Sequence, residues 1–102
     1  MVTLKQVRED LKEIRYYYSR KEIFEQGCRV VGESVGIVEK ARRYNNAVKY
    51  APTRLYDLYI SLYLQNRTQD AFASELGYSP EYVYQMNTRL CEYLTKQLNG
   101  EK

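Results

Sequence analysis

The chain contains no histidine and no tryptophan, and its 102 residues include only two cysteines, two prolines and five glycines. Without histidine it cannot build a His-ligated zinc site, a Ser-His-Asp triad or a Cys-His nucleophile pair. The glycines form neither a GxGxxG nor a P-loop pattern. No pair of carboxylates stands out as an acid and a base. We therefore expect a protein that is not an enzyme and that holds no metal ion and no cofactor.

The two cysteines, Cys28 and Cys91, lie far apart and outside any CxxC spacing, which favours buried, reduced thiols. No apolar run approaches the ~20 residues that a membrane-spanning helix requires. The N-terminal stretch MVTLKQVRED carries charges where a signal peptide has its apolar segment. These features predict a soluble, cytoplasmic protein that makes no contact with a membrane.

Length and composition are those of one globular domain, residues 1–102, with 44% hydrophobic and 28% charged residues. The net charge of +3 is unevenly distributed along the chain. Residues 1–50 carry eleven Lys and Arg against seven Asp and Glu, whereas residues 51–102 carry five against six. The second half is therefore slightly acidic, which argues against strong phosphate binding by that half alone.

Apolar residues recur at helical spacing in the N-terminal half, and no strand pattern or internal repeat interrupts them. The first helix is expected to start after Thr3, which forms a capping box with Gln6. It ends either at the tyrosine triplet 16–18 or at Gly27, and glycines predict a looser stretch over residues 27–36. Three consecutive tyrosines cannot all face one core, so at least one ring should be exposed, as at an interface.

A second amphipathic helix is predicted over residues 36–51, and Pro52 marks the start of the next one. That next helix is apolar on nearly every side, as the central helix of a bundle would be. Its tyrosines at helical spacing are expected in the core or at an interface: Tyr56, Tyr59 and Tyr63. The sequence therefore predicts an all-α fold with N-terminal helices in residues 1–51.

Residues 52–98 end in two helices that are separated by a tight corner. Thr68 caps the first helix, and Gly77 ends it in a conformation with positive φ. Ser79 caps the second helix, which starts at Pro80. This spacing is typical of a DNA-binding helix-turn-helix, although a helical hairpin in a plain bundle has the same pattern. The predicted seam between the helices consists of Phe72, Leu76, Val83 and Met86, with the small Ala73 allowing a close crossing.

The stretch TQDAFASELGYSPEYVYQMNTRLCEYL resembles the C-terminal helix-turn-helix of bacterial sigma factors, known as region four. The resemblance covers residues 55–98, and Phe72 and Met86 stand where the family has isoleucine. As a whole the chain looks like the small region-four-like proteins of phages and mobile elements of Gram-positive bacteria. The matching positions are Thr68, Phe72, Ala73, Leu76, Gly77, Ser79, Val83, Gln85, Met86 and Leu94.

The resemblance implies that the helix starting at Pro80 enters the major groove of DNA and reads bases. Glu81 would accept a hydrogen bond from a cytosine amine, and Gln85 would pair with adenine. The family often has basic residues where this chain has Pro80, Tyr82 and Tyr84. The residues implied to contact DNA are Thr68, Ser79, Pro80, Glu81, Tyr82, Tyr84, Gln85, Thr88 and Arg89.

Phosphate contacts are expected from basic residues outside this set. Arg54 and Arg67 lie close to the motif in sequence, and a basic cluster lies in the preceding helix. The alternative interpretation is that this cluster is only the solvent-exposed face of a helix. The candidate phosphate contacts are Arg54, Arg67, Lys40, Arg42, Arg43 and Lys49.

Two functions follow from these patterns. The first is a sequence-specific, DNA-binding transcription regulator of phage or mobile-element type, whose partner is double-stranded DNA and whose N-terminal helices form a homodimer or a partner contact. The second is a protein-interaction module that binds RNA polymerase or another regulator without reading DNA, which the acidic second half and the tyrosines favour. A basic surface that runs from the last helix to residues 40–49 would favour DNA binding.

Overall fold

The computed structural model describes residues 1–21 and 31–100, with the backbone alone for residues 31–35. Within these ranges the chain is helical and contains no strand, so the predicted all-α fold is confirmed. No helix in the described ranges combines the length and the apolar composition needed to cross a bilayer. The elements are α1 (Leu4–Ser19), α3 (Val31–Val48), α4 (Thr53–Tyr59), the π-helical turn η1 (Ile60–Leu64), α5 (Gln69–Leu76) and α6 (Pro80–Leu98).

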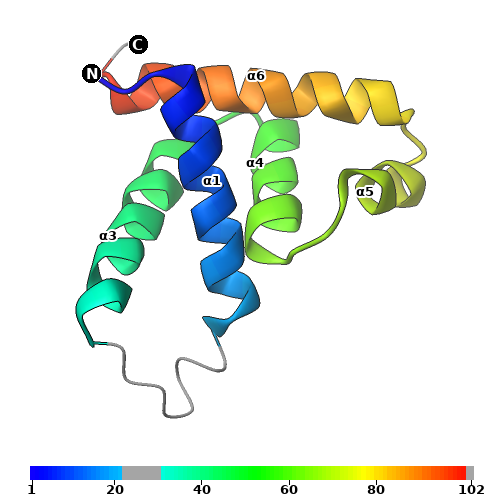
Figure 1. Ribbon diagram of the computed structural model, residues 1–102. Coiled ribbons are helices and arrows are strands. Elements are labelled where there is room, and N and C mark those ends of the chain that lie inside the picture. Colours follow the sequence, from blue (N-terminus) through cyan, green and yellow to red (C-terminus); the bar gives the residue numbers. More distant parts are fainter. Residues whose placement is uncertain (22–30, 101–102) are drawn as a thin grey trace.

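The long helix α6 lies across one end of the molecule, and the other helices lie below it (Figure 1). It contacts α1, α3, α4 and α5, while α1 also packs against α3 and η1. The two chain ends meet, because the amide of Val2 donates to Asn99 Oδ1 (2.8 Å) and Asn99 Nδ2 donates to the carbonyl of Val2 (2.9 Å). This pair of hydrogen bonds ties the start of the chain to the end of α6.

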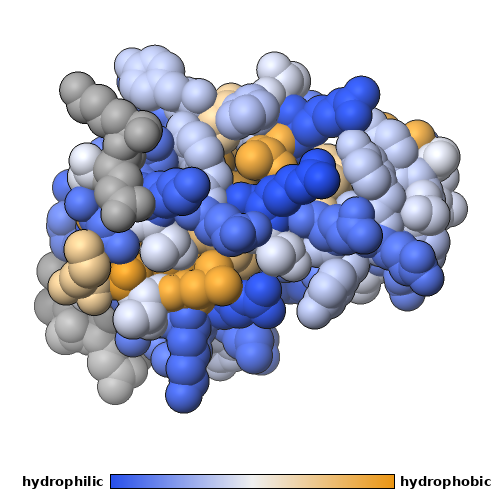
Figure 2. Space-filling view, turned by 90° about the horizontal axis from the view of Figure 1, so that it is seen from above, coloured by the Kyte–Doolittle hydropathy of each residue, from blue (hydrophilic) through white to orange (hydrophobic). Residues whose placement is uncertain are grey.

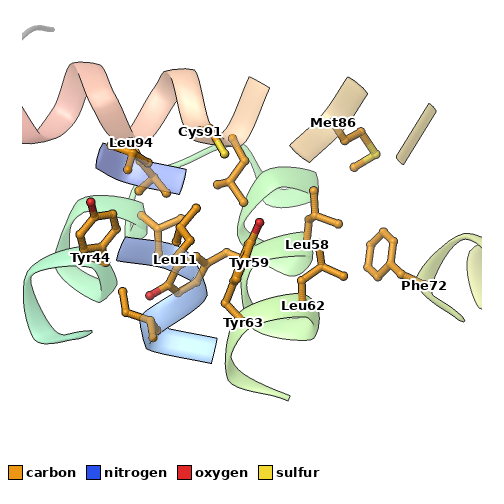
Figure 3. Close-up of a cluster of buried hydrophobic side chains, with 14 of the residues drawn as sticks. Leu11, Tyr44, Leu58, Tyr59, Leu62, Tyr63, Phe72, Met86, Cys91 and Leu94 are labelled. Atoms are coloured by element: carbon orange, nitrogen blue, oxygen red, sulfur yellow. The ribbon is translucent and has the colours of Figure 1, made fainter. Parts of the chain in front are cut away.

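One cluster of buried side chains forms the core (Figure 3). The first part of the cluster joins α1, α3 and α6 and includes Leu11, Tyr44 and Leu94. Tyr59 lies near the centre of the whole cluster. Cys91 is 1% exposed, and burial raises the pKa of its thiol, as expected for a small hydrophobic residue. The second part of the cluster joins α4, η1, α5 and α6 through Leu58, Leu62, Phe72 and Met86.

The first helix begins at the predicted cap, but only half of the predicted capping box forms. Thr3 Oγ1 accepts from the amide of Gln6 (3.1 Å), which is one half of the capping box. The side chain of Gln6 does not reach back to Thr3, because its Nε2 donates to the buried carboxylate of Asp10 (2.9 Å). α1 ends at Ser19, the first of the two expected positions, and Tyr16 in the triplet is 58% exposed.

The looser stretch expected around the glycines is wrong for residues 31–36, which form the first turns of α3. A glycine inside a helix costs only about 1 kcal/mol relative to alanine. The long helix that follows, which packs on α1 and α6, can outweigh that penalty. Gly27 and Cys28 lie outside the described residues.

The helix expected after Pro52 changes character in its second half. α4 passes into η1, where the amide of Gln65 donates to the carbonyl of Ile60 (2.9 Å), and Asn66 then turns the chain with a φ of 58°. Arg15 of α1 holds this turn: its Nε donates to Asn66 Oδ1 (3.2 Å) and its Nη2 to the carbonyl of Asn66 (3.3 Å). Of the three tyrosines, Tyr59 and Tyr63 are buried, whereas Tyr56 is 39% exposed.

Candidate nucleic-acid interface

The corner between α5 and α6 has the local structure that the sequence predicts. Thr68 Oγ1 accepts from the amide of Ala71 (3.0 Å) and caps α5. Gly77 ends α5 with a φ of 71°, a left-handed conformation that a side chain would strain. Ser79 Oγ accepts from a backbone amide of the first turn of α6 (3.2 Å), and Pro80 is the first residue of that helix. These contacts set the direction in which α6 leaves the corner.

The seam between the two helices differs from the prediction at one position. Phe72, Val83 and Met86 are buried, as expected, and so is Ala73. Leu76, however, is 51% exposed. Leu76 is the last residue of α5, and its side chain lines a surface groove outside the seam.

We define the recognition face as the side of α6 formed by Glu81, Tyr84, Gln85 and Thr88. The spacing of three, four and seven residues from Glu81 places these side chains on one side of a helix. Glu81, Tyr84 and Gln85 are exposed, and Thr88 is half-buried with its Oγ1 donating to the carbonyl of Tyr84 (3.2 Å). Figure 2 is a view from the α6 side of the molecule, and the surface on this side is largely hydrophilic. The buried residues of α6 lie on the opposite side of the helix.

Tyr82, which the resemblance implies to contact DNA, does not extend freely into solvent. Its ring is half-buried against the core and meets Tyr78 edge to face, with ring centres 5.1 Å apart. Its hydroxyl accepts a hydrogen bond from Arg54 Nη1 (2.9 Å), which also raises the pKa of Arg54. Tyr82 therefore connects the start of α4 to the start of α6.

Two of the predicted phosphate contacts on α3 are engaged in ion pairs. Lys40 Nζ lies 3.2 Å from Asp10 Oδ1 and also donates to Glu13, whose hydrogen bond raises the pKa of Lys40. Arg42 Nη1 lies 3.1 Å from Glu39 Oε1. α3 and the first turns of α6 lie on opposite sides of the molecule (Figure 1). The structure therefore does not bring the basic cluster, which also includes Arg43 and Lys49, next to the recognition face.

The basic residues nearest the motif fall into two groups. Arg67 pairs with Glu75 of α5 through both terminal nitrogens. Arg54 and Arg89 make no ion pair with a carboxylate in the described part of the chain. They line one surface groove of about 260 Å³, together with Pro52, Leu55, Tyr82 and Met86.

The chain matches no family model, no curated protein and no solved structure. The resemblance to sigma-factor region four therefore remains a prediction from the sequence.

Two polar contacts behind the recognition face were not predicted. Tyr63 of η1 donates its hydroxyl to Asn87 Oδ1 of α6 (2.5 Å), and burial raises the pKa of that hydroxyl. The second is the bond between Arg54 and Tyr82. The partners are 24 and 28 residues apart in sequence. No periodicity or spacing rule links residues at such separations, so only the folded chain pairs them.

Proposed function

We propose that the protein is a sequence-specific, DNA-binding transcription regulator that places the first half of α6 in the major groove. The observation that carries this proposal is the two-sided character of that half-helix. Val83 and Met86 are buried on one side, while Glu81, Tyr84 and Gln85 are exposed on the other. A recognition helix needs this combination, because it must be rigid in the protein and open to base edges.

The exposed side chains have the chemistry of base recognition. The carboxamide of Gln85 can donate to and accept from adenine in a bidentate pair, and the carboxylate of Glu81 can accept from the cytosine amine. Each good pair contributes about 1–3 kcal/mol of discrimination against the wrong base. Tyr84, with its ring 59% exposed, offers an apolar surface that suits the methyl group of thymine.

The resemblance to sigma-factor region four supports the same function, in a regulator of phage or mobile-element type. The low charge near the recognition face suggests that one copy binds DNA weakly. A second copy, or RNA polymerase, would add the missing affinity, and paired modules read half-sites about one helical turn apart. The exposed rings of Tyr16 and Tyr50 on the N-terminal half are candidates for such contacts.

The test is a selection from random-sequence duplex DNA, at low and at physiological salt. We expect an enriched motif that Gln85→Ala binds about tenfold less tightly, with the loss confined to one base pair. The matched control is Gln97→Ala, because Gln97 is also exposed on α6 but lies near the other end of the helix. This control variant should enrich the same motif with unchanged affinity. Failure to enrich any sequence, even at low salt, would refute DNA binding by the isolated protein.

A groove between α4, η1 and α5 favours the second function, a protein-interaction module. It measures about 470 Å³ and is lined by the exposed side chains of Leu76 (51%) and Tyr56 (39%), with Phe72 and Ile60 beneath them. An apolar groove with a polar rim is typical of a protein contact. Calorimetry with purified RNA polymerase, in the absence of DNA, tests this function. Binding that Leu76→Ala abolishes would favour it, whereas no heat of binding would exclude polymerase as the partner.

A further inference from the structure

We propose that Arg54 and Arg89 together bind one DNA phosphate at the edge of the recognition face, and that Tyr82 is the positioning residue that holds Arg54 there. This inference rests on the proposed function and specifies how the protein grips the DNA backbone. The residues come from two helices, since Arg54 lies in the first turn of α4 and the other two lie on α6. All three line the same groove of about 260 Å³.

Arg54 and Arg89 are available to bind a phosphate. Lys40, Arg42 and Arg67 are paired with carboxylates of the protein itself, and a phosphate would have to displace those partners. Arg54 and Arg89 have no such competitor among the described residues, and both are exposed. A guanidinium binds phosphate through parallel N–H donors, which favours arginine for this contact.

The groove lined by Arg54, Tyr82 and Arg89 also lies beside Gln85 of the recognition face. On α6, Gln85 follows Tyr82 by three residues and precedes Arg89 by four, so the three side chains form one stripe along the helix. The groove with Arg54 therefore borders the recognition face directly. When a helix reads base edges in the major groove, the flanking strands present phosphates to the borders of that helix.

Tyr82 orients Arg54 without occupying all of its donors. Its hydroxyl accepts one hydrogen from Arg54 Nη1, and a guanidinium carries five N–H donors, so the remaining donors are available for a phosphate. The ring of Tyr82 is itself held by Tyr78 and by the core. An arginine that is already oriented loses less conformational entropy when it binds its ligand. Tyr82 thus acts through Arg54 and contacts no base in this proposal.

The experiment measures duplex binding of the full chain as a function of salt. The slope of log K against log salt concentration is negative, and its magnitude falls by about 0.9 for each phosphate contact that is lost. Because the two arginines share one phosphate, Arg54→Ala/Arg89→Ala should lower this magnitude by about 0.9, and not by twice that amount. Tyr82→Phe keeps both charges, so it should keep the wild-type slope while binding about threefold less tightly. The control is Lys12→Ala, which removes an exposed cation from α1, outside every proposed contact, and should change neither quantity.

Each other outcome overturns a defined part of the inference. An unchanged slope in the double variant, or an equal decrease in Lys12→Ala, would show that no phosphate is held at this groove. A decrease of about 1.8 would mean that the arginines bind separate phosphates. If Tyr82→Phe bound DNA with wild-type affinity, Tyr82 would have no role in positioning Arg54. In these cases the recognition that depends on Gln85 would still stand, whereas a wild-type chain that binds no DNA would refute both proposals.

Discussion

Replacing Asp10 with alanine should lower the free energy of unfolding by about 3 kcal/mol, because its buried carboxylate joins α1 to α3. Asp10 is 3% exposed. It accepts hydrogen bonds from the hydroxyl of Tyr44 (2.6 Å) and from Nε2 of Gln6 (2.9 Å), and Lys40 Nζ lies 3.2 Å away. The substitution removes the acceptor that all three donors share.

The size of this loss in unfolding free energy depends on whether each donor finds another hydrogen-bond partner after the substitution. Tyr44 is 0% exposed, so its hydroxyl would stay unsatisfied at a cost of about 1–3 kcal/mol. Gln6 is exposed and Lys40 keeps Glu13, so their losses are smaller. Tyr44→Phe alone removes one hydrogen bond and should cost about 1.5 kcal/mol. The double variant lacks the unsatisfied hydroxyl, so it should be at least about 1 kcal/mol more stable than the sum of the single effects implies.

Urea unfolding at neutral pH, followed by far-UV circular dichroism, measures all four corners of this cycle. Glu13→Ala is the matched control, because Glu13 pairs with the same Lys40 but its side chain is 56% exposed, and its loss should cost under about 1 kcal/mol. Single effects that add within about 0.5 kcal/mol would refute the reasoning, since the carboxylate and the hydroxyl would then not depend on each other. If Glu13→Ala lowered the free energy of unfolding as much as Asp10→Ala, the proposed importance of the buried carboxylate would also be contradicted.

Two further predictions concern pH and the corner glycine. Burial by itself raises the pKa of Asp10, but hydrogen bonds from Tyr44, Gln6 and Lys40 outweigh it and hold that pKa below its ordinary value of 3.8. The stability that the Asp10 carboxylate contributes is therefore complete above about pH 5, begins to decrease near the ordinary pKa of 3.8 and is lost as the pH falls through the lowered pKa. The difference in unfolding free energy between wild type and Asp10→Asn should shrink only below about pH 5, and a decrease between neutral pH and about pH 5 would contradict this. Gly77→Ala should cost about 1–2 kcal/mol in thermal unfolding and Gly77→Asn less, because an added Cβ meets no atom within 4 Å and the penalty is purely that of positive φ. Equal melting temperatures for the two variants would mean that the left-handed conformation is not the cause.

The features predicted correctly are local ones. The caps at Thr3, Thr68 and Ser79 and the left-handed Gly77 each depend on residues within three or four positions along the chain. Local hydrogen bonds and φ preferences decide them, so the sequence contains the whole argument. The buried side of α6 was predictable for the same reason, because helical periodicity groups its apolar residues without reference to any partner helix.

The predictions for the candidate site are wrong where the surroundings of a side chain depend on the tertiary structure. Periodicity placed Leu76 in the seam, but the end of α5 leaves it exposed. The cluster of basic residues predicted a phosphate contact at Lys40, but Lys40 pairs with Asp10 and Glu13 of α1. A charge count along the chain cannot distinguish a cation that is already neutralised from one that is available.

Short-range periodicity and capping specify the all-α class and the caps and corner of residues 68–98, so these features could be predicted from the sequence alone. Which charges remain available beside the recognition face depends on how the helices pack against one another. Arg54 and Arg89 come together with Tyr82 because α4 packs against α6, whereas α3 carries its basic residues to the opposite side of the molecule. The physical reason is that ion pairing and groove formation depend on distances through space, and the packing of the core sets those distances.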